Sequence, residues 1–322
     1  QSIMKRFLTY SILVFCFLIY GCKFDEIKSV STTGDLSIVV DENFEPLMLD
    51  EIKEFERLNP GSKIQLKSLP TNNAIADLIN GDTKMIVVGR NLNEEEKALL
   101  QKNKLELKEY PFAIDGIGFI VNVKNPVLRI TSDDLNKVFS GEFKNWTDIK
   151  AQNETQNAEV KSFFKGNKDK IKLFIQRKNS ATNKYIQDSV LKNLEYATTA
   201  AVCSTSVQML NEIRSNESSI GIITMNWLSK GNQDTIDTTV KTLRVSKIRD
   251  NGVQQDFAEF HQGLIFNGIY PYRRTVYIFS TDLGIKLSTG FITFLLKSDG
   301  QKVVLRNSLV PLYQPVRTIQ LN

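Results

Sequence analysis

The sequence has few of the side chains on which most enzymes depend. It contains one histidine, His261, and three cysteines, Cys16, Cys22 and Cys203, among 322 residues. Nothing in the sequence places the single imidazole beside a nucleophile, and one histidine with so few thiols cannot supply the four ligands typical of zinc. No Gly-x-Ser-x-Gly or P-loop motif is present either. We therefore expect no enzyme, no metal site and no cofactor.

The sequence also has no strong charge excess. It carries 41 Lys and Arg against 36 Asp and Glu, a formal net charge of +5. Proteins that bind nucleic acid through its phosphates usually concentrate basic residues on one face or in one stretch. No nucleic-acid partner is therefore expected. The apolar fraction of 41% and charged fraction of 24% are ordinary for a globular protein, and the length allows two domains.

One pronounced apolar run, residues 7–20, lies near the N-terminus after Lys5 and Arg6. It is shorter than the roughly 20 residues that span a bilayer, and it has the length and flanks of a signal-peptide core. Residues 18–22, Leu-Ile-Tyr-Gly-Cys, resemble the lipobox of bacterial lipoproteins. This resemblance implies removal of residues 1–21 and a lipid on Cys22. A short membrane anchor that is never cleaved is the alternative.

Loss of such a signal peptide would change the charge and the cysteine count. Without Lys5 and Arg6 the net charge falls to +3, and Cys203 becomes the only thiol that carries no lipid, so no intramolecular disulfide is possible. Cys203 follows Ala-Ala-Val and is interpreted as a small buried residue. Residues 22–34 are polar and predict a lipidated tether. A bacterial cell-envelope location is expected, on the periplasmic face or the cell surface.

Alternating apolar strands and amphipathic helices predict an α/β fold. Strands are predicted over residues 36–40, 63–69, 85–88, 117–121, 172–175, 220–224 and 276–280. Helices are predicted over residues 47–58, 74–79, 94–102, 133–139, 183–194 and 290–297. The β-α alternation of the first part is typical of a parallel sheet covered on both faces. Residues 152–170 are polar without an apolar period, so they predict an inserted surface loop, and residues 231–239 predict another loop.

Six blocks in order resemble the substrate-binding proteins of phosphate ABC transporters. The most specific is Leu-Asn-Lys-Val-Phe-Ser-Gly at 135–141 followed by Asn-Trp-Thr-Asp-Ile at 145–149. The others are an Asp-Gly pair and apolar run at 112–122, Asn-Pro at 125–126, and segments 219–222, 270–278 and 300–312. The resemblance implies an α/β clamshell, like that of periplasmic binding proteins, with two doubly wound lobes joined by two crossing strands. It further implies lobe I at 35–111 plus 269–322, lobe II at 112–268, and a monomer.

Residues 176–182, Gln-Arg-Lys-Asn-Ser-Ala-Thr, resemble that family's anion loop, typically Arg-x-x-x-Ser-Gly-Thr. They precede a predicted helix, whose first N–H groups lack partners and favour negative charge. The resemblance implies that the ligand contacts four members of this loop, Arg177, Asn179, Ser180 and Thr182. The alternative is that Asn179 or Ser180 only caps the helix and Arg177 is a surface charge. The loop is one residue shorter than the family's, and Ala181 replaces glycine.

Two further loops are implied to reach the ligand, and both depart from the family. The first, Asp41 to Pro46, would contribute Asn43 and Phe44, but it contains three acids where relatives have Gly, Ser and Thr. If Asp41 and Glu42 point into the cleft, an anionic ligand is disfavoured. The other loop, residues 88–91, keeps a positive charge at Arg90 but has Gly89 where relatives often have a serine. Asp41 or Asp115 could accept a proton from phosphate.

The expected function is capture of a small anion, with phosphate favoured, for an ABC permease. The protein would be held at the membrane by its lipid alone. The alternative is a binding lipoprotein without transport, a sensor or a scaffold whose cleft has been re-purposed.

Overall fold

The structure is a computed structural model that describes residues 30–150, 153–231, 236–247 and 254–313. The predicted signal peptide, Cys22 and most of the predicted tether lie outside these residues, as does part of the predicted loop 231–239. Within the described ranges, no helix combines the length and apolar character needed to cross a membrane.

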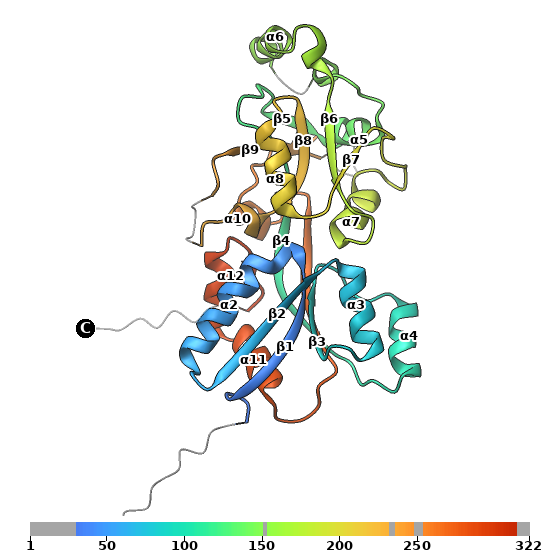
Figure 1. The fold of residues 1–322 in the computed structure, drawn as a ribbon. Coiled ribbons are helices and arrows are strands. Elements are labelled where there is room, and N and C mark those ends of the chain that lie inside the picture. Colours follow the sequence, from blue (N-terminus) through green and yellow to red (C-terminus); the bar gives the residue numbers. More distant parts are fainter. Residues whose placement is uncertain (1–29, 151–152, 232–235, 248–253, 314–322) are drawn as a thin grey trace, which may run out of the picture.

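Two lobes lie end to end and share a single mixed sheet (Figure 1). The strand order is β2-β1-β3-β11-β4-β8-β6-β7, with β9 and β12 paired to β4 off this path. The long strand β4 (Lys108–Asn122) and the antiparallel strand β11 (Arg273–Ser280) run between the lobes. The predicted α/β fold of two lobes joined by two crossing strands is confirmed.

Lobe I is a doubly covered sheet. Its elements are β1 (Gly34–Asp41), η1 (Glu42–Phe44), α2 (Glu45–Leu58), β2 (Ser62–Leu69), α3 (Thr71–Asn80), β3 (Met85–Val88), α4 (Glu94–Lys102), α11 (Leu287–Leu296), α12 (Ser298–Arg306) and β12 (Val310–Pro311). Strand β1 pairs in parallel with β2 and β3. Its side chains alternate, so that Ile38 and Val40 pack with residues of α2, α11 and α12, while Val39 packs with residues of α3 and α4. These two groups of helices lie on opposite sides of the strands (Figure 1). The predicted pattern of helices on both faces is therefore present.

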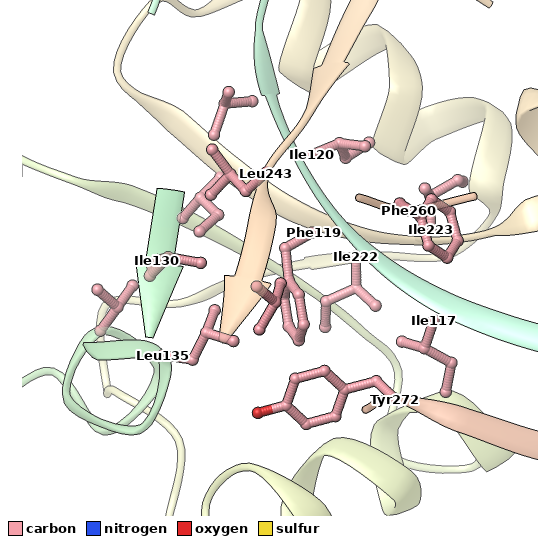
Figure 2. Packing of buried hydrophobic residues seen from close by; sticks show 14 of the residues in the cluster. Ile117, Phe119, Ile120, Ile130, Leu135, Ile222, Ile223, Leu243, Phe260 and Tyr272 are labelled. Atoms are coloured by element: carbon pink, nitrogen blue, oxygen red, sulfur yellow. The ribbon is translucent and has the colours of Figure 1, made fainter. Parts of the chain in front are cut away.

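Lobe II surrounds the other half of β4. Its elements are β5 (Arg129–Thr131), α5 (Ser132–Ser140), η2 (Trp146–Asp148), α6 (Glu154–Phe163), η3 (Gly166–Asp169), β6 (Lys172–Gln176), α7 (Ala181–Ser189), β7 (Ala201–Cys203), α8 (Ser206–Ser215), β8 (Ser219–Thr224), α9 (Met225–Leu228), β9 (Val240–Thr242), β10 (Arg244–Ser246) and α10 (Gln262–Phe266). Figure 2 shows Phe119 of β4 above Tyr272, with ring centroids 5.2 Å apart. Ile130 and Leu135 close the same cluster.

The prediction of a loop over residues 152–170 is wrong, because α6 occupies much of it. Asn153 caps this helix by accepting a hydrogen bond from the backbone N–H of Gln156 (2.9 Å). Only Val160 in the helix is buried, and Phe164 just after it stacks on Trp146 at 5.7 Å. A helix that buries so few apolar side chains leaves no periodic signal in the sequence.

The predicted helix over residues 183–194 also differs from the structure. Helix α7 already begins at Ala181 and ends at Ser189. Beyond it, Lys192 and Asn193 adopt positive φ angles of 52° and 70°, a conformation that a right-handed helix cannot continue through.

Two glycines of β4 allow lobe II to close over the crossing strand. A Cβ on Gly118 would lie 2.5 Å from the ring of Phe260, and one on Gly116 would lie 2.3 Å from Ile265. Both neighbours are buried, so neither has free space into which it can move.

We predict that Gly118→Ala lowers the free energy of unfolding by about 1–2 kcal/mol, since overpacking of a filled core forces neighbours out of place. Chemical denaturation of the purified protein measures this difference. Phe260→Leu should relieve the clash, so the double variant should lose less stability than the two single variants combined. Additive losses would contradict the proposed contact.

Candidate functional site

The site lies where the loops after β1 and β6 meet between the lobes. The side-chain amide of Gln176 at the end of β6 donates to Oδ1 of Asn43 (2.9 Å), and both residues are buried. The backbone carbonyl of Asn43 accepts from Asn226 Nδ2 (2.6 Å) and Thr224 Oγ1 (3.2 Å). Two of the segments predicted to reach the ligand are thus adjacent, although they lie 133 residues apart in sequence.

The N-termini of two helices from opposite lobes meet across this cleft. The backbone N–H of Ala181, the first residue of α7, donates to Oγ1 of Thr71, the first residue of α3 (2.8 Å). The backbone N–H of Asn72 donates to the carbonyl of Asn179 (3.1 Å), and Asn179 Nδ2 donates to Asn73 Oδ1 (2.8 Å). The lobes are therefore closed on each other, and protein groups occupy the helix ends.

One cavity in the cleft holds about 10 Å³, close to the space of one water molecule, and a wider one of about 390 Å³ adjoins it at Glu42, Arg177 and Thr205. The smaller cavity lies next to the helix ends. Its lining comes from both lobes. The lining residues are Asp41, Glu42, Asn43, Pro70, Gln176, Arg177, Ser180, Cys203, Ser204 and Thr205. Among the residues that the structure describes, no group of three or more His, Cys, Asp or Glu is placed to hold a metal ion.

Ser180 and Thr182 both lie at the N-terminus of helix α7, but their side chains differ in hydrogen bonding. Ser180 is the cap, since its Oγ accepts from the N–H of Asn183 (3.0 Å) and also bonds Gln176 Oε1 (3.1 Å). The capping alternative thus applies to Ser180. Thr182 is fully buried, and its Oγ1 has no hydrogen-bond partner among the described residues. An unpaired buried hydroxyl is uncommon and costs stability unless something else binds it.

Asp41 and Glu42 both face the cleft, the arrangement that disfavours an anion. Each carboxylate is, however, already bound by donors. Asp41 accepts from the Thr71 hydroxyl and from the backbone N–H (3.1 Å) and Nδ2 (2.8 Å) of Asn43. Glu42 accepts from the backbone N–H (2.6 Å) and Oγ (3.1 Å) of Ser206 at the start of α8. These hydrogen bonds partly compensate the negative charge of the two carboxylates. They therefore reduce the repulsion between the carboxylates and an anionic ligand.

A buried ion pair that the sequence analysis did not identify lies on the crossing strands. Arg274 of β11 stands opposite Asp115 of β4, and its Nε donates to Asp115 Oδ2 (3.2 Å). The Arg274 guanidinium also lies over the ring of Phe44, 5.2 Å from its centroid. A Cβ on residue 89 would come within 2.8 Å of this guanidinium, so Gly89 makes room for it. The Tyr-Pro-Tyr-Arg-Arg block was the only signal in the sequence, and it did not show where the arginine points.

The remaining predicted residues are spread around the cleft. Arg177 is half-buried at the cavity wall, and its side chain makes no hydrogen bond or ion pair within the described residues. Arg90 pairs with Glu96 (2.7 Å), also bonds Asn72 Oδ1 (3.0 Å), and does not line the cavity. Gln176 stands four residues before Ser180, where the family's anion loop has its arginine. Arg177 is therefore one residue closer to Ser180 than the arginine of that loop is to its serine.

Comparisons with known proteins agree with this architecture. The sequence pattern of the PBP superfamily domain matches residues 28–299. The phosphate-binding protein PstS of Pseudomonas aeruginosa is 22% identical over 88% of this chain and 85% of its own length. PstS of Borreliella burgdorferi is 21% identical over 94% of this chain and 96% of its own. The chain therefore belongs to the PBP superfamily.

The fold is also that of a solved relative. A phosphate-bound substrate-binding protein from Clostridium perfringens, assigned to phosphate ABC transporters, superposes with a TM-score of 0.69. The two are 22% identical, and the match covers 87% of this chain and 100% of that one. The resemblance to the substrate-binding proteins of phosphate ABC transporters is confirmed.

The contact between Glu42 and α8 makes a pH-dependent prediction. Burial raises the pKa of Glu42 to about 7, with smaller contributions from Asp41 and Glu45, and the bonds from Ser206 only partly oppose this. In the unfolded chain the pKa returns to its ordinary value near 4.5. The native state therefore holds an extra proton between these values, and its stabilising contribution is lost as the pH rises through about 7.

We predict that Glu42→Gln, which keeps an oxygen acceptor for Ser206 but does not ionise, is stabilised relative to the wild-type protein at pH 8 and not at pH 5. Thermal unfolding of both proteins at the two pH values measures this difference. The comparison cancels the titration of all other groups. An equal difference at both pH values would show that Glu42 does not titrate in this contact.

Proposed function

We propose that this chain is a lipid-anchored receptor that captures inorganic phosphate between its lobes and delivers it to an ABC importer. The observation that carries the proposal is the convergence of the N-termini of α3 and α7 from opposite lobes. Helix N-termini present unpaired N–H groups and partial positive charge, which suits an oxyanion. The relatives are named phosphate-binding proteins, which supports phosphate as the oxyanion.

Capture at the helix ends requires the lobes to part, because their N–H groups are paired across the lobes and the cavity beside them, about 10 Å³, is too small for phosphate. The strands β4 and β11 provide the connection about which such a hinge motion would occur. Opening would separate Ala181 from Thr71 and Asn72 from Asn179, which frees two backbone N–H groups, while the Thr71 hydroxyl keeps its bond to Asp41 of the same lobe. The N–H groups that join the two lobes in the closed structure are thus the ones that would bind the anion.

Asp41 is the acceptor that we assign to the phosphate proton. It is fully buried at the end of β1 and lines the cavity of the cleft beside Pro70 and Ser180, whereas Asp115 does not line that cavity and is paired with Arg274. A carboxylate can accept a hydrogen bond from protonated phosphate but repels sulfate, which carries no proton at neutral pH. Selectivity for phosphate over sulfate follows.

Two acids in the cleft also favour a second candidate function. Asp41 accepts a hydrogen bond from the Thr71 hydroxyl of α3, and Glu42 accepts one from the backbone N–H of Ser206 at the start of α8. A cleft whose hydrogen-bond donors are bound by its own side chains could belong to a sensor or scaffold lipoprotein, which would not transport a ligand. The ligand test below decides between the two functions.

We predict that millimolar phosphate raises the thermal unfolding midpoint of residues 23–322 by roughly 5 °C, since saturation at about 100 times the Kd adds about 2.7 kcal/mol. Sulfate at the same concentration and ionic strength should give no shift. Asp41→Asn should reduce the response to phosphate and narrow the difference between the two anions. Differential scanning calorimetry at pH 7.5 measures all of these shifts.

No shift with phosphate in a cooperatively unfolding protein would contradict phosphate capture and favour the re-purposed cleft. Equal shifts with both anions would support an oxyanion site but contradict the role of Asp41.

We predict that the full chain produced in a bacterium carries lipid on Cys22 and has lost residues 1–21. Detergent-phase partitioning and the mass of the N-terminal peptide test both points, and Cys22→Ser should move the protein to the aqueous phase. A mature chain that still begins before residue 22 would favour the uncleaved anchor instead.

A further inference from the structure

The guanidinium of Arg274 is buried but only partly bonded. The side chain is 4% exposed, and its Nε donates to Asp115 on the neighbouring crossing strand. Its Nη1 and Nη2 are both buried and have no hydrogen-bond partner in the described part of the chain. Arg274 therefore presents four N–H groups for which the described part of the chain supplies no acceptor.

Such unpaired charged donors are rare because desolvation is costly when no new bond compensates for it. The surroundings nevertheless hold the group firmly in place. Gly89 leaves the space that the guanidinium fills, and the Phe44 ring supports its face at 5.2 Å. A position that is shielded from bulk solvent and has no protein acceptor suits a ligand that brings acceptors.

A second unpaired donor lies on the helix that faces Arg274. Tyr185 of α7 donates its hydroxyl to the carbonyl of Arg273 (3.1 Å), which places the start of α7 beside the start of β11. Thr182 lies one turn earlier on the same face, and its buried Oγ1 has no partner among the described residues. Arg274 and Thr182 thus come from the two sides of one inter-lobe contact.

The other arginines of this region are less suited to hold an anion. Glu96 neutralises Arg90 through both Nη atoms (2.8 and 2.7 Å). Arg273 is exposed and donates to the Ile265 carbonyl (3.1 Å). Arg177 stays half-buried in water contact at the cavity wall, and the strand-end position before it is the neutral Gln176.

We propose that Arg274, on the second crossing strand, is the cation that anchors the captured oxyanion, with the Thr182 hydroxyl as a second donor. The inference rests on the proposed function and names the charge that the site uses. Nη1 and Nη2 would grip two oxygens in a bidentate arrangement, while Nε remains on Asp115. Because the anchor lies on a strand that joins the lobes, the bound anion and the closed hinge would stabilise each other.

The test compares phosphate affinity by isothermal titration calorimetry in four proteins. Arg274→Gln alone would leave Asp115 buried and unpaired, so the informative variant is Arg274→Gln combined with Asp115→Asn, which keeps a neutral hydrogen bond between the strands. Arg273→Gln is the matched control on the neighbouring residue. Arg177→Gln tests the loop arginine as the competing anchor. Circular dichroism and cooperative unfolding establish that each variant is folded.

We expect the double variant to bind phosphate at least about 30-fold more weakly, the loss typical when a buried charge is removed from its partner. Arg273→Gln should stay within about twofold of the wild type, and Arg177→Gln should lose less than about tenfold. Wild-type affinity in the folded double variant, or a larger loss in Arg177→Gln, would overturn the inference.

Stability without ligand provides a readout that does not depend on phosphate. If the unpaired guanidinium is kept for a ligand, the double variant should unfold at the same temperature as the wild type or higher. A fall of several degrees would show that the pair is structural and would overturn the inference. Should the wild type fail to bind phosphate, the proposed function fails by itself, and this comparison still decides the role of Arg274.

Discussion

The contact between the N-termini of α3 and α7 is the constraint on which the closed cleft depends. Each lobe directs the partial positive end of a helix into the cleft, and such ends need acceptors. In this structure the acceptors come from the protein: Thr71 Oγ1 serves Ala181, the carbonyl of Asn179 serves Asn72, and the Glu42 carboxylate serves α8. All three contacts join the two lobes, so the helix-end donors that suit an anion also hold the cleft closed.

The pairing of the crossing strands β4 and β11 fixes the positions of the charged side chains that lie on them. Arg274 and Asp115 are direct partners in the antiparallel pairing of β11 with β4, and the pairing shifts only beyond Val276. A slip of β11 by one residue would turn Arg274 to the face of the sheet opposite Asp115. The ion pair is therefore a consequence of strand register, and register in turn depends on the apolar side chains that each lobe buries on either side of it.

Local signals in the sequence predicted local structure well and the site only in part. The bounds of β3 and α4 agree with the structure because a short apolar run between turns and an Asn93 cap with Glu96 at N3 are self-contained signals. The loops after β1 and β6 were joined only through the family resemblance. Arg274 and Glu42 depend on partners 159 and 164 residues away, and no pattern in one sequence shows which distant residues meet.

The acids of the cleft need not exclude an anion once their protonation is considered. Burial raises the pKa of Asp115 to about 6 even beside Arg274, and raises that of Glu42 to about 7. Near neutral pH a fraction of these carboxyls is therefore uncharged, while a guanidinium stays protonated at any such pH. The first loop contains three acids near the proposed ligand, but burial in the closed fold makes Glu42 a weak acid, and Asp115 on the crossing strand is weakened in the same way. The same fold leaves both Nη atoms of Arg274 without an acceptor in the described part of the chain. Burial, rather than the count of charged residues, sets the charge that an anion would meet in this cleft.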